Sequence, residues 1–504
     1  MPKVTFISQN GETVITAESG ALLSDLLLSG GSPLEMPCGG KGRCGKCRVR
    51  AEGALSKATA DEAAALRPDE LSAGIRLACC TRLLGDAAVW TANRLEEGQI
   101  QAEGAVGFFT KKPYFRHYGA AVDIGTTTLA ARLYGQDGPV SSAVSLNPQR
   151  IFGADVISRI HAAMNGKTEE LARCVREEIS RLLVKLADDA GISVEEIDAA
   201  VITGNTAMLH LFAKADPSPL AAAPFQAKEL FGKTGEGKDF DLPCHPQAKI
   251  YLPRCMSAFV GADITTALLA SGICDRDETA LLVDIGTNGE MALWHQGNLL
   301  CCSTAAGPAF EGAGLSCGMP GVTGAIDRIA PEDGKLAVHV IGDVPAAGIC
   351  GSGVVDAVAA IRQLGWMDET GRLSSEEDIS LAGSVRIIQK DIRMVQLAKS
   401  AVCAGVKTLL DTAGIDAASL HTFAVAGGFG SYLNLSNAAR IGLYPPELEK
   451  KAAVLGNAAL SGAAMLLENT DFISRSEQAA HGSDTVDLSV NPVFMEQYIE
   501  CMEF

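Results

Sequence analysis

The chain is short of positive charge. Its 504 residues include 42 lysines and arginines against 60 aspartates and glutamates, so the formal net charge is −18 at pH 7. Because an acidic surface repels phosphate backbones and anionic lipid, we expect neither nucleic acid nor a membrane surface as a partner. The sequence shows no N-terminal signal pattern and no apolar run long enough to span a bilayer. A cytoplasmic location is therefore expected.

Aromatic residues are also scarce, at 5% of the chain, whereas glycine is abundant with 53 residues. This balance favours an α/β architecture with many tight turns between strands and helices. The chain is too long for a single hydrophobic core, so we expect several domains. Its 15 cysteines do not indicate a disulfide scaffold in a chain of this length. Clustered cysteines in a reducing cytosol are instead expected to bind metal.

Residues 1–91 have the order of elements that is typical of a β-grasp domain. Two short strands surround a turn at Asn10 and Gly11, and a helix, a glycine-rich loop and three further strands follow. The predicted strands and helix cover residues 3–18, 22–28, 47–51, 76–83 and 87–91.

Residues 92–117 are predicted to be a linker, because they lack clear periodicity and contain several glycines. From residue 118 onward, strands and helices alternate. A strand–turn–strand motif occurs twice in this part of the chain, as AVDIGTTT at 121–128 and LVDIGTNG at 282–289. The repeat predicts two related subdomains that face each other, over 118–278 and 279–504.

Four cysteines in the first domain have the spacing of an iron–sulfur site. Cys38, Cys44 and Cys47 share one glycine-rich loop, CGGKGRCGKC, and Cys79 follows in LACCT. Thiolates bind iron, and glycines let the backbone fold around a cluster and aim N–H groups at its sulfurs. The spacing resembles the adrenodoxin-like and bacterial [2Fe–2S] ferredoxins, whose LAC sequence favours Cys79 over Cys80 as the fourth ligand. Structural zinc is the alternative, but zinc sites usually pair two C-x2-C motifs.

The repeated motif indicates a nucleotide site. Each copy puts an aspartate at the end of a strand, Asp123 or Asp284, and then a turn whose N–H groups can cradle phosphate oxygens. Such an aspartate can hold Mg²⁺, usually through water. With AVAGGFG at 424–430, the motifs follow the order phosphate 1, phosphate 2, adenosine that is found in actin-like ATPases. The nucleotide-binding candidates are Gly125, Thr126, Thr127, Thr128, Gly286, Thr287, Asn288, Gly289, Gly307, Gly351, Ser352, Gly353, Gly427 and Gly428.

Three residues are candidates for the catalytic carboxylate: Asp123, Asp284 and Glu290. Asp155 and Asp263 both stand in a Gly-Ala-Asp context and are predicted to cap helices instead. The GICGSG turn at 348–353 precedes a predicted helix. It could present the helix N-terminus to phosphate or act only as a hinge, and the sequence does not choose between the two.

Together these motifs resemble the reductive activators of corrinoid-dependent enzymes, the RACE family. The resemblance covers almost the whole chain and is also carried by GADVISRI, TGNTAMLHL, STAAGPAFEG and NPVFMEQY. It implies a β-grasp [2Fe–2S] ferredoxin domain followed by a two-subdomain actin-like ATPase of the ribonuclease H-like (ASKHA) class. It also implies ATP-dependent one-electron reduction of Co(II) to Co(I) in the corrinoid protein of a methyltransferase system. The resemblance further implies an upstream electron donor and a homodimer.

Three other hypotheses fit parts of the sequence. One is a small-molecule kinase with a fused redox-sensing ferredoxin domain, and another is a non-enzymatic assembly or chaperone module with a zinc domain. The activators of 2-hydroxyacyl-CoA dehydratases also couple an actin-like ATPase to electron transfer, but they have no ferredoxin domain. A reducible cluster would exclude the zinc module, and ATPase activity stimulated by a corrinoid protein would exclude the kinase.

Overall fold

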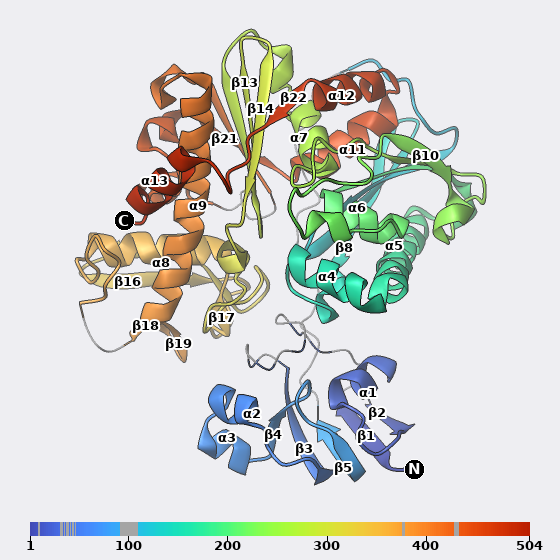
Figure 1. Cartoon of the computed structure of the whole chain (residues 1–504), viewed down its shortest axis with the longest axis vertical. Coiled ribbons are helices and arrows are strands. Elements are labelled where there is room, and N and C mark those ends of the chain that lie inside the picture. Colours follow the sequence, from blue (N-terminus) through green and yellow to red (C-terminus); the bar gives the residue numbers. More distant parts are fainter. Residues whose placement is uncertain are drawn as a thin grey trace.

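A computed structural model describes residues 1–8, 11–30, 34, 36, 40, 42, 45, 47–90, 109–374, 378–427 and 433–504 (Figure 1). Three larger sheets, of five, six and six strands, organise this part of the chain, and two smaller sheets accompany them. Among the described residues, no helix combines the length and the apolar character needed to cross a membrane.

The N-terminal domain is a mixed five-stranded sheet with strand order β2-β1-β5-β3-β4, in which β1 and β5 run parallel. Helix α1 packs on this sheet through Leu23, Leu26 and Leu27, whose spacing places them on one helix face. This is the predicted β-grasp arrangement, and the two short helices α2 and α3 are additions to the prediction. The elements are β1 (Lys3–Ser8), β2 (Gly11–Thr16), α1 (Leu23–Ser29), β3 (Arg48–Leu55), α2 (Ala60–Ala65), α3 (Pro68–Ser72), β4 (Ile75–Leu77) and β5 (Leu83–Trp90).

The second sheet has the order β10-β11-β9-β6-β7-β8. Helix α5 covers it with a buried stripe at helical spacing that includes Leu171, Val175 and Ile179. The charged side chains of strand β10 are tolerated because it is an edge strand. The elements are β6 (Tyr118–Ile124), β7 (Thr128–Gly135), β8 (Gly138–Leu146), α4 (Val156–Ala162), α5 (Thr168–Ala190), β9 (Ile197–Gly204), α6 (Thr206–Ala213), β10 (Lys233–Glu236), β11 (Lys249–Leu252) and α7 (Ala262–Ser271).

The third sheet has the order β21-β20-β12-β13-β14-β22. Its first five strands repeat the order and directions of β11-β9-β6-β7-β8, as the repeated sequence motif predicts. The main strands are β12 (Ala280–Ile285), β13 (Gly289–His295), β14 (Asn298–Thr304), β20 (Thr422–Ala426), β21 (Ala452–Gly456) and β22 (Ser483–Thr485). The helices are α9 (Gln389–Ala413), α10 (Leu435–Arg440), α11 (Ala458–Glu468), α12 (Asp471–His481) and α13 (Pro492–Glu500).

A smaller subdomain is inserted between β14 and α9. It holds α8 and two small sheets, one of which has the order β16-β15-β17 (Figure 1). Its elements are β15 (Ala325–Glu332), β16 (Lys335–Val340), β17 (Gly348–Ile349), α8 (Gly351–Gln363), β18 (Ile379–Ala382) and β19 (Val385–Ile387).

The two large sheets exchange helices. Helix α11 follows β21 in sequence, yet its Leu460 and Leu467 pack in one core with Val201 of the other sheet. Helix α7 does the reverse, since Ile264 packs in one core with Leu282. The helices touch each other so closely at Gly462 that an added Cβ would lie 1.8 Å from a backbone oxygen of α7. The two lobes are therefore joined through the α7–α11 pair.

The predicted linker lies partly outside the described residues, but its last nine residues, 109–117, are fixed in place. The Lys112 N–H donates to Glu468 O at 2.9 Å, and the Phe109 ring contacts Phe472 with centroids 5.1 Å apart. These residues hold the start of β6 against the end of α11.

Candidate functional site

Two of the four predicted cluster cysteines lie in the described part of the chain, and their sulfurs meet. Cys47 Sγ and Cys79 Sγ are 3.3 Å apart, and both side chains are buried. Two thiolates on one tetrahedral metal ion with bonds of about 2.3 Å would be about 3.7 Å apart, so the pair suits a shared iron. The hydrogen bond between the two sulfurs lowers the pKa of Cys47 to about 7, against the effect of burial. Cys38 and Cys44 lie outside the described residues.

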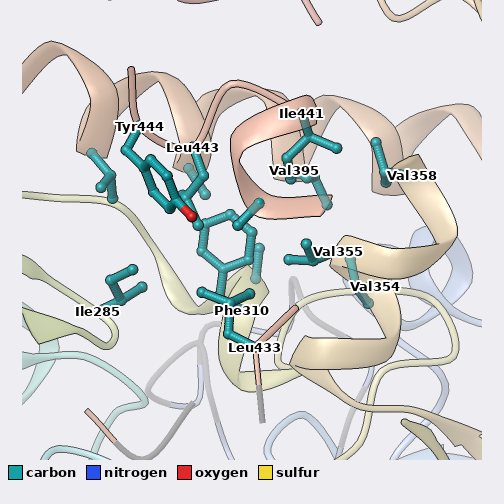
Figure 2. Packing of buried hydrophobic residues seen from close by; sticks show 14 of the residues in the cluster. Ile285, Phe310, Val354, Val355, Val358, Val395, Leu433, Ile441, Leu443 and Tyr444 are labelled. Atoms are coloured by element: carbon teal, nitrogen blue, oxygen red, sulfur yellow. The ribbon is translucent and has the colours of Figure 1, made fainter. Parts of the chain in front are cut away.

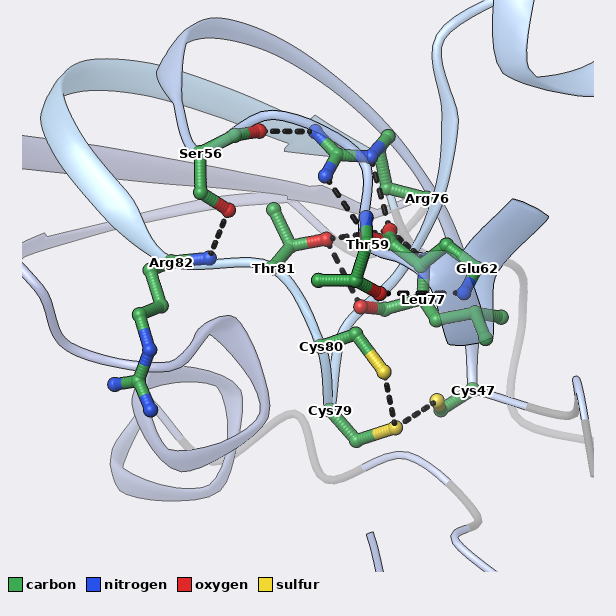
Figure 3. Close-up of polar contacts among 10 residues, drawn as sticks. All are labelled: Cys47, Ser56, Thr59, Glu62, Arg76, Leu77, Cys79, Cys80, Thr81 and Arg82. Atoms are coloured by element: carbon green, nitrogen blue, oxygen red, sulfur yellow. Dashed lines mark hydrogen bonds and ion pairs between the residues drawn. The ribbon is translucent and has the colours of Figure 1, made fainter. Parts of the chain in front are cut away.

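Cys80 is the other candidate for the fourth ligand, and its Sγ lies 3.7 Å from Cys79 Sγ (Figure 3). Unlike the Cys79 side chain, the Cys80 side chain is half-buried, and it packs against Gly42, where an added Cβ would lie 2.9 Å from the Cys80 sulfur. Of these two cysteines, Cys79 is the one whose sulfur forms a hydrogen bond with the Cys47 sulfur. The geometry therefore favours Cys79, and the assignment stays a prediction.

A buried carboxylate fixes the segment that carries Cys79. Glu62 is fully buried, and its Oε1 accepts hydrogen bonds from Leu77 N (3.1 Å) and Thr81 Oγ1 (3.0 Å), which flank the cysteine (Figure 3). Its two oxygens also pair with the Arg76 guanidinium, at 2.9 and 3.0 Å. The network thus holds the backbone on both sides of Cys79.

We expect Glu62→Gln to destabilise the N-terminal domain by about 3 kcal/mol, because Arg76 would keep a buried charge without a charged partner. Burial acts to raise the pKa of Glu62, but the hydrogen bonds from Arg76, Thr59 and Leu77 outweigh it, so the pKa lies below its usual value. The stabilisation is therefore present above the usual pKa of glutamate and lost as the pH falls through the lowered pKa. Urea unfolding followed by visible absorbance of the cluster would measure it.

The matched control for this variant is Glu52→Gln, which breaks the exposed Arg50–Glu52 ion pair of 2.6 Å in the same domain. Exposed pairs contribute roughly 0–1 kcal/mol. Equal losses in the two variants would show that the Glu62 network has no special role.

The two predicted phosphate loops are brought together from different sheets. Asp123 and Asp284 stand at the ends of β6 and β12, each one residue before the last residue of its strand. Asn457, which caps α11, donates to Asp123 Oδ2 at 3.0 Å. Glu311 links the loops directly, because its Oε2 accepts hydrogen bonds from Thr127 and Thr287. Asp123 also interacts electrostatically with Asp284, so the fold places the two aspartates near each other.

Buried polar side chains hold the first loop in shape. Asn147 donates to the Gly125 carbonyl at 2.8 Å, and Asn205 donates to Thr126 Oγ1 at 3.2 Å. The fully buried Arg159 donates to the Thr126 carbonyl at 2.6 Å, and burial lowers its pKa to about 10. These contacts give the Gly125 and Thr126 carbonyls hydrogen-bond partners within the protein.

Five carboxyl groups lie near one another and interact electrostatically: Asp123, Asp263, Asp284, Glu290 and Glu311. Burial and neighbouring carboxylates raise the pKa of Asp284 to about 7 and that of Asp263 to about 8, while burial raises that of Asp123 to about 6. The pKa of Glu290 is raised well above its usual value for the same reasons. Such a group of acids is stabilised by a bound cation.

No three acidic, histidine or cysteine side chains in the described ranges converge closely enough to hold a bare metal ion. A Mg²⁺ ion held through water by Asp123 and Asp284 stays a prediction. Glu290 lies opposite Asp284 on the neighbouring strand, and its Oε1 has no hydrogen-bond partner among the residues that the structure describes.

The glycine motif after β20 meets the second phosphate loop. At Gly427 an added Cβ would lie 2.7 Å from Asp284 Oδ1, and the φ of +98° also requires glycine. Gly428 lies outside the described residues. Beyond the motif, an open groove of about 750 Å³ is lined by α8, α10 and the β15–β16 hairpin, including Leu433, Asn434 and Asn437. Its volume is sufficient for a nucleoside.

The GICGSG turn is explained by packing. Gly353 lies against β15, where an added Cβ would be 2.2 Å from the Ile326 carbonyl oxygen, and Ser352 donates to Asp327 O at 3.0 Å. Helix α8 begins at Gly351, within the GICGSG turn itself. These contacts support a structural role for the turn, and its binding of phosphate stays a prediction.

The two Gly-Ala-Asp aspartates behave differently. Asp155 caps α4 by accepting from the Ser158 N–H at 2.7 Å, as predicted. Asp263 is not the N-cap of α7, which is Gly261, but in the first turn its Oδ1 accepts from the Ile264 N–H at 2.8 Å, and its carboxyl also belongs to the acidic group. Asp263, Glu311 and Asn457 are therefore residues of the site that the sequence reasoning missed. The STAAGPAFEG motif contains Glu311, but nothing in it indicated which residue mattered.

These features define a class of protein, a β-grasp iron–sulfur domain joined to an actin-like ATPase. Comparison with protein families agrees with each part. The matches are a 2Fe-2S iron–sulfur cluster binding domain over residues 6–84, the RACo middle region over 118–276, and the C-terminal ASKHA domain of RACo over 278–504. The chain belongs to the RACo family, the reductive activators of corrinoid proteins. The predicted fold class and family are thus confirmed.

Individual relatives span most of the chain. The corrinoid activation enzyme RamQ of Eubacterium limosum is 34% identical over 413 residues, which cover 76% of this chain and 69% of RamQ. A [Co(II) methylated amine-specific corrinoid protein] reductase of Methanosarcina barkeri is 26% identical, over 68% of each chain. The solved structure of a reductive activator for corrinoid, iron-sulfur protein superposes with a TM-score of 0.71 and 26% identity, covering 100% of this chain and 98% of that one.

Proposed function

We propose that this protein reduces a corrinoid protein from Co(II) to Co(I) by one electron and couples that transfer to ATP hydrolysis. One observation carries the proposal. A single chain holds a Cys47–Cys79 sulfur pair that suits a [2Fe–2S] cluster, and two predicted phosphate loops that are joined through Glu311. The printed functions of the relatives, corrinoid activation and Co(II) corrinoid protein reduction, support it.

Cys38, Cys44, Cys47 and Cys79 would hold the cluster, which supplies one-electron chemistry. Asp123 and Asp284 would position Mg²⁺ and water at the phosphates, with Glu290 as a further candidate for the catalytic carboxylate. The groove beside α10 would take the adenosine group. The glycine and hydroxyl residues predicted for both phosphate loops, together with Gly307 and Gly427, would surround the nucleotide.

The need for ATP follows from redox energetics. Plant-type [2Fe–2S] ferredoxins have potentials near about −400 mV, and each further 59 mV of uphill one-electron transfer lowers the equilibrium about tenfold. Because α7 and α11 couple the two lobes, nucleotide-dependent movement of the lobes could change the state of a docked corrinoid protein. Upstream electron donation, a homodimeric assembly and a cytoplasmic location complete the proposal.

Anaerobic mixing with a Co(II) corrinoid protein and a reductant tests the proposal directly. We expect the Co(I) absorption band to grow when Mg-ATP is present and to stay absent with ADP. ATP hydrolysis should rise when the corrinoid protein is added. Equal Co(I) formation with and without ATP would contradict the coupling, and phosphorylation of a metabolite without any cobalt change would favour the kinase hypothesis.

A further inference from the structure

Glu311 makes a contact that no predicted role accounts for. Its Oε2 accepts hydrogen bonds from two hydroxyl groups, Thr127 Oγ1 at 2.6 Å and Thr287 Oγ1 at 2.8 Å. The two threonines occupy the first and second phosphate loops, which belong to different sheets. One carboxylate oxygen of Glu311 therefore joins the two loops.

The local sequence fixes Glu311 in this place. It ends a short 3-10 turn, Pro308–Glu311, in which the neighbouring Phe310 is 1% exposed and packs among Ile285, Val354 and Tyr444 (Figure 2). At the start of the turn, the Gly307 N–H donates to Thr287 O at 2.9 Å. The buried ring and the backbone bond hold the turn against the second phosphate loop, so the carboxylate does not reach the loops by chance.

The two hydroxyls are groups that a phosphate would use. Hydroxyl and backbone donors in such turns bind phosphate oxygens, and a carboxylate is the protein's own anionic acceptor of similar hydrogen bonds. In this structure Glu311 takes both hydroxyls with one oxygen. A terminal phosphate that entered between the loops would meet a negative charge at the same donors. Either the carboxylate withdraws or the phosphate binds weakly.

We infer that Glu311 is a latch, a positioning residue that holds the two phosphate loops together without nucleotide and releases Thr127 and Thr287 to the terminal phosphate of ATP. The inference rests on the proposed ATP-dependent function. The latch links the spacing of the two loops to occupancy of the nucleotide site. It also sets the affinity for ATP, because part of the binding free energy is used to displace the carboxylate.

Titration calorimetry of the full-length protein with ATP, in EDTA and then in Mg²⁺, tests the latch. Glu311→Gln keeps an oxygen acceptor of the same reach but removes the negative charge, so we expect it to bind Mg-free ATP about tenfold more tightly than the wild type. The matched control is Glu195→Gln, which makes the same charge change at an exposed position in the short turn Val194–Glu196 before β9. Its affinity should equal that of the wild type.

The outcomes separate the latch from the function on which it rests. If the wild type binds no ATP under either condition, the proposed function fails. If the wild type binds ATP but Glu311→Gln binds Mg-free ATP equally or more weakly, the latch is wrong. Weaker binding of Glu311→Gln in Mg²⁺ alone would make Glu311 a metal-site residue instead. Melting curves check that each variant is folded, and Glu311→Ala, with the same expected gain in affinity, replaces a Gln variant that is not.

Discussion

Replacing Cys79 by serine should abolish the [2Fe–2S] absorbance of anaerobically purified protein. Cys79 Sγ lies 3.3 Å from Cys47 Sγ in a buried position, and removal of one of four thiolates leaves an iron without its ligand. The ATPase lobes have their own cores, so ATP hydrolysis in the absence of a corrinoid protein should persist. Visible spectra, iron and labile sulfide analysis, and a phosphate-release assay would measure both effects.

Cys80→Ser is the matched control, since it removes the adjacent thiol at 3.7 Å and should leave the spectrum intact. The reverse pattern, with the cluster lost only in Cys80→Ser, would move the fourth ligand to Cys80. Stoichiometric zinc without labile sulfide in the wild type would overturn the cluster assignment altogether.

Asp284→Asn should lower the rate of ATP hydrolysis at least about 100-fold, because it removes a charge that would hold Mg²⁺ and its water at the phosphates. Asparagine keeps the size of the side chain, which matters because Gly427 packs directly against Asp284 Oδ1. The visible spectrum of the cluster should not change, since the carboxyl lies in the other domain. Phosphate release at saturating Mg-ATP gives the rate.

Asp277→Asn, an exposed change on the segment that leads into β12, serves as the control and should hydrolyse ATP at the wild-type rate. If Asp284→Asn also turned over normally, Asp284 would lose its proposed role. The same substitution at Asp123 and Glu290 would then be the next measurement.

Much of this molecule could be predicted from short segments of the sequence. The spacing of Cys38, Cys44 and Cys47 expresses a local requirement, a loop that folds around one cluster. Asp123 and Asp284 are equally local, because each belongs to a strand and the turn that follows it. Their repetition also predicted two related sheets, and β12 and β6 do occupy equivalent places in those sheets.

The tertiary structure alone decided which side chains of the two lobes contact each other. Glu311 reaches Thr127 over 184 positions of sequence, and Asn457 reaches Asp123 over 334. Hydrogen bonds of this kind depend on how two sheets are placed relative to each other, and no periodicity or spacing records that placement. Candidate site residues that belong to one turn could therefore be predicted from the sequence. Asp263 and the Glu311 bridge became visible only once the α7–α11 pair had brought the two lobes together.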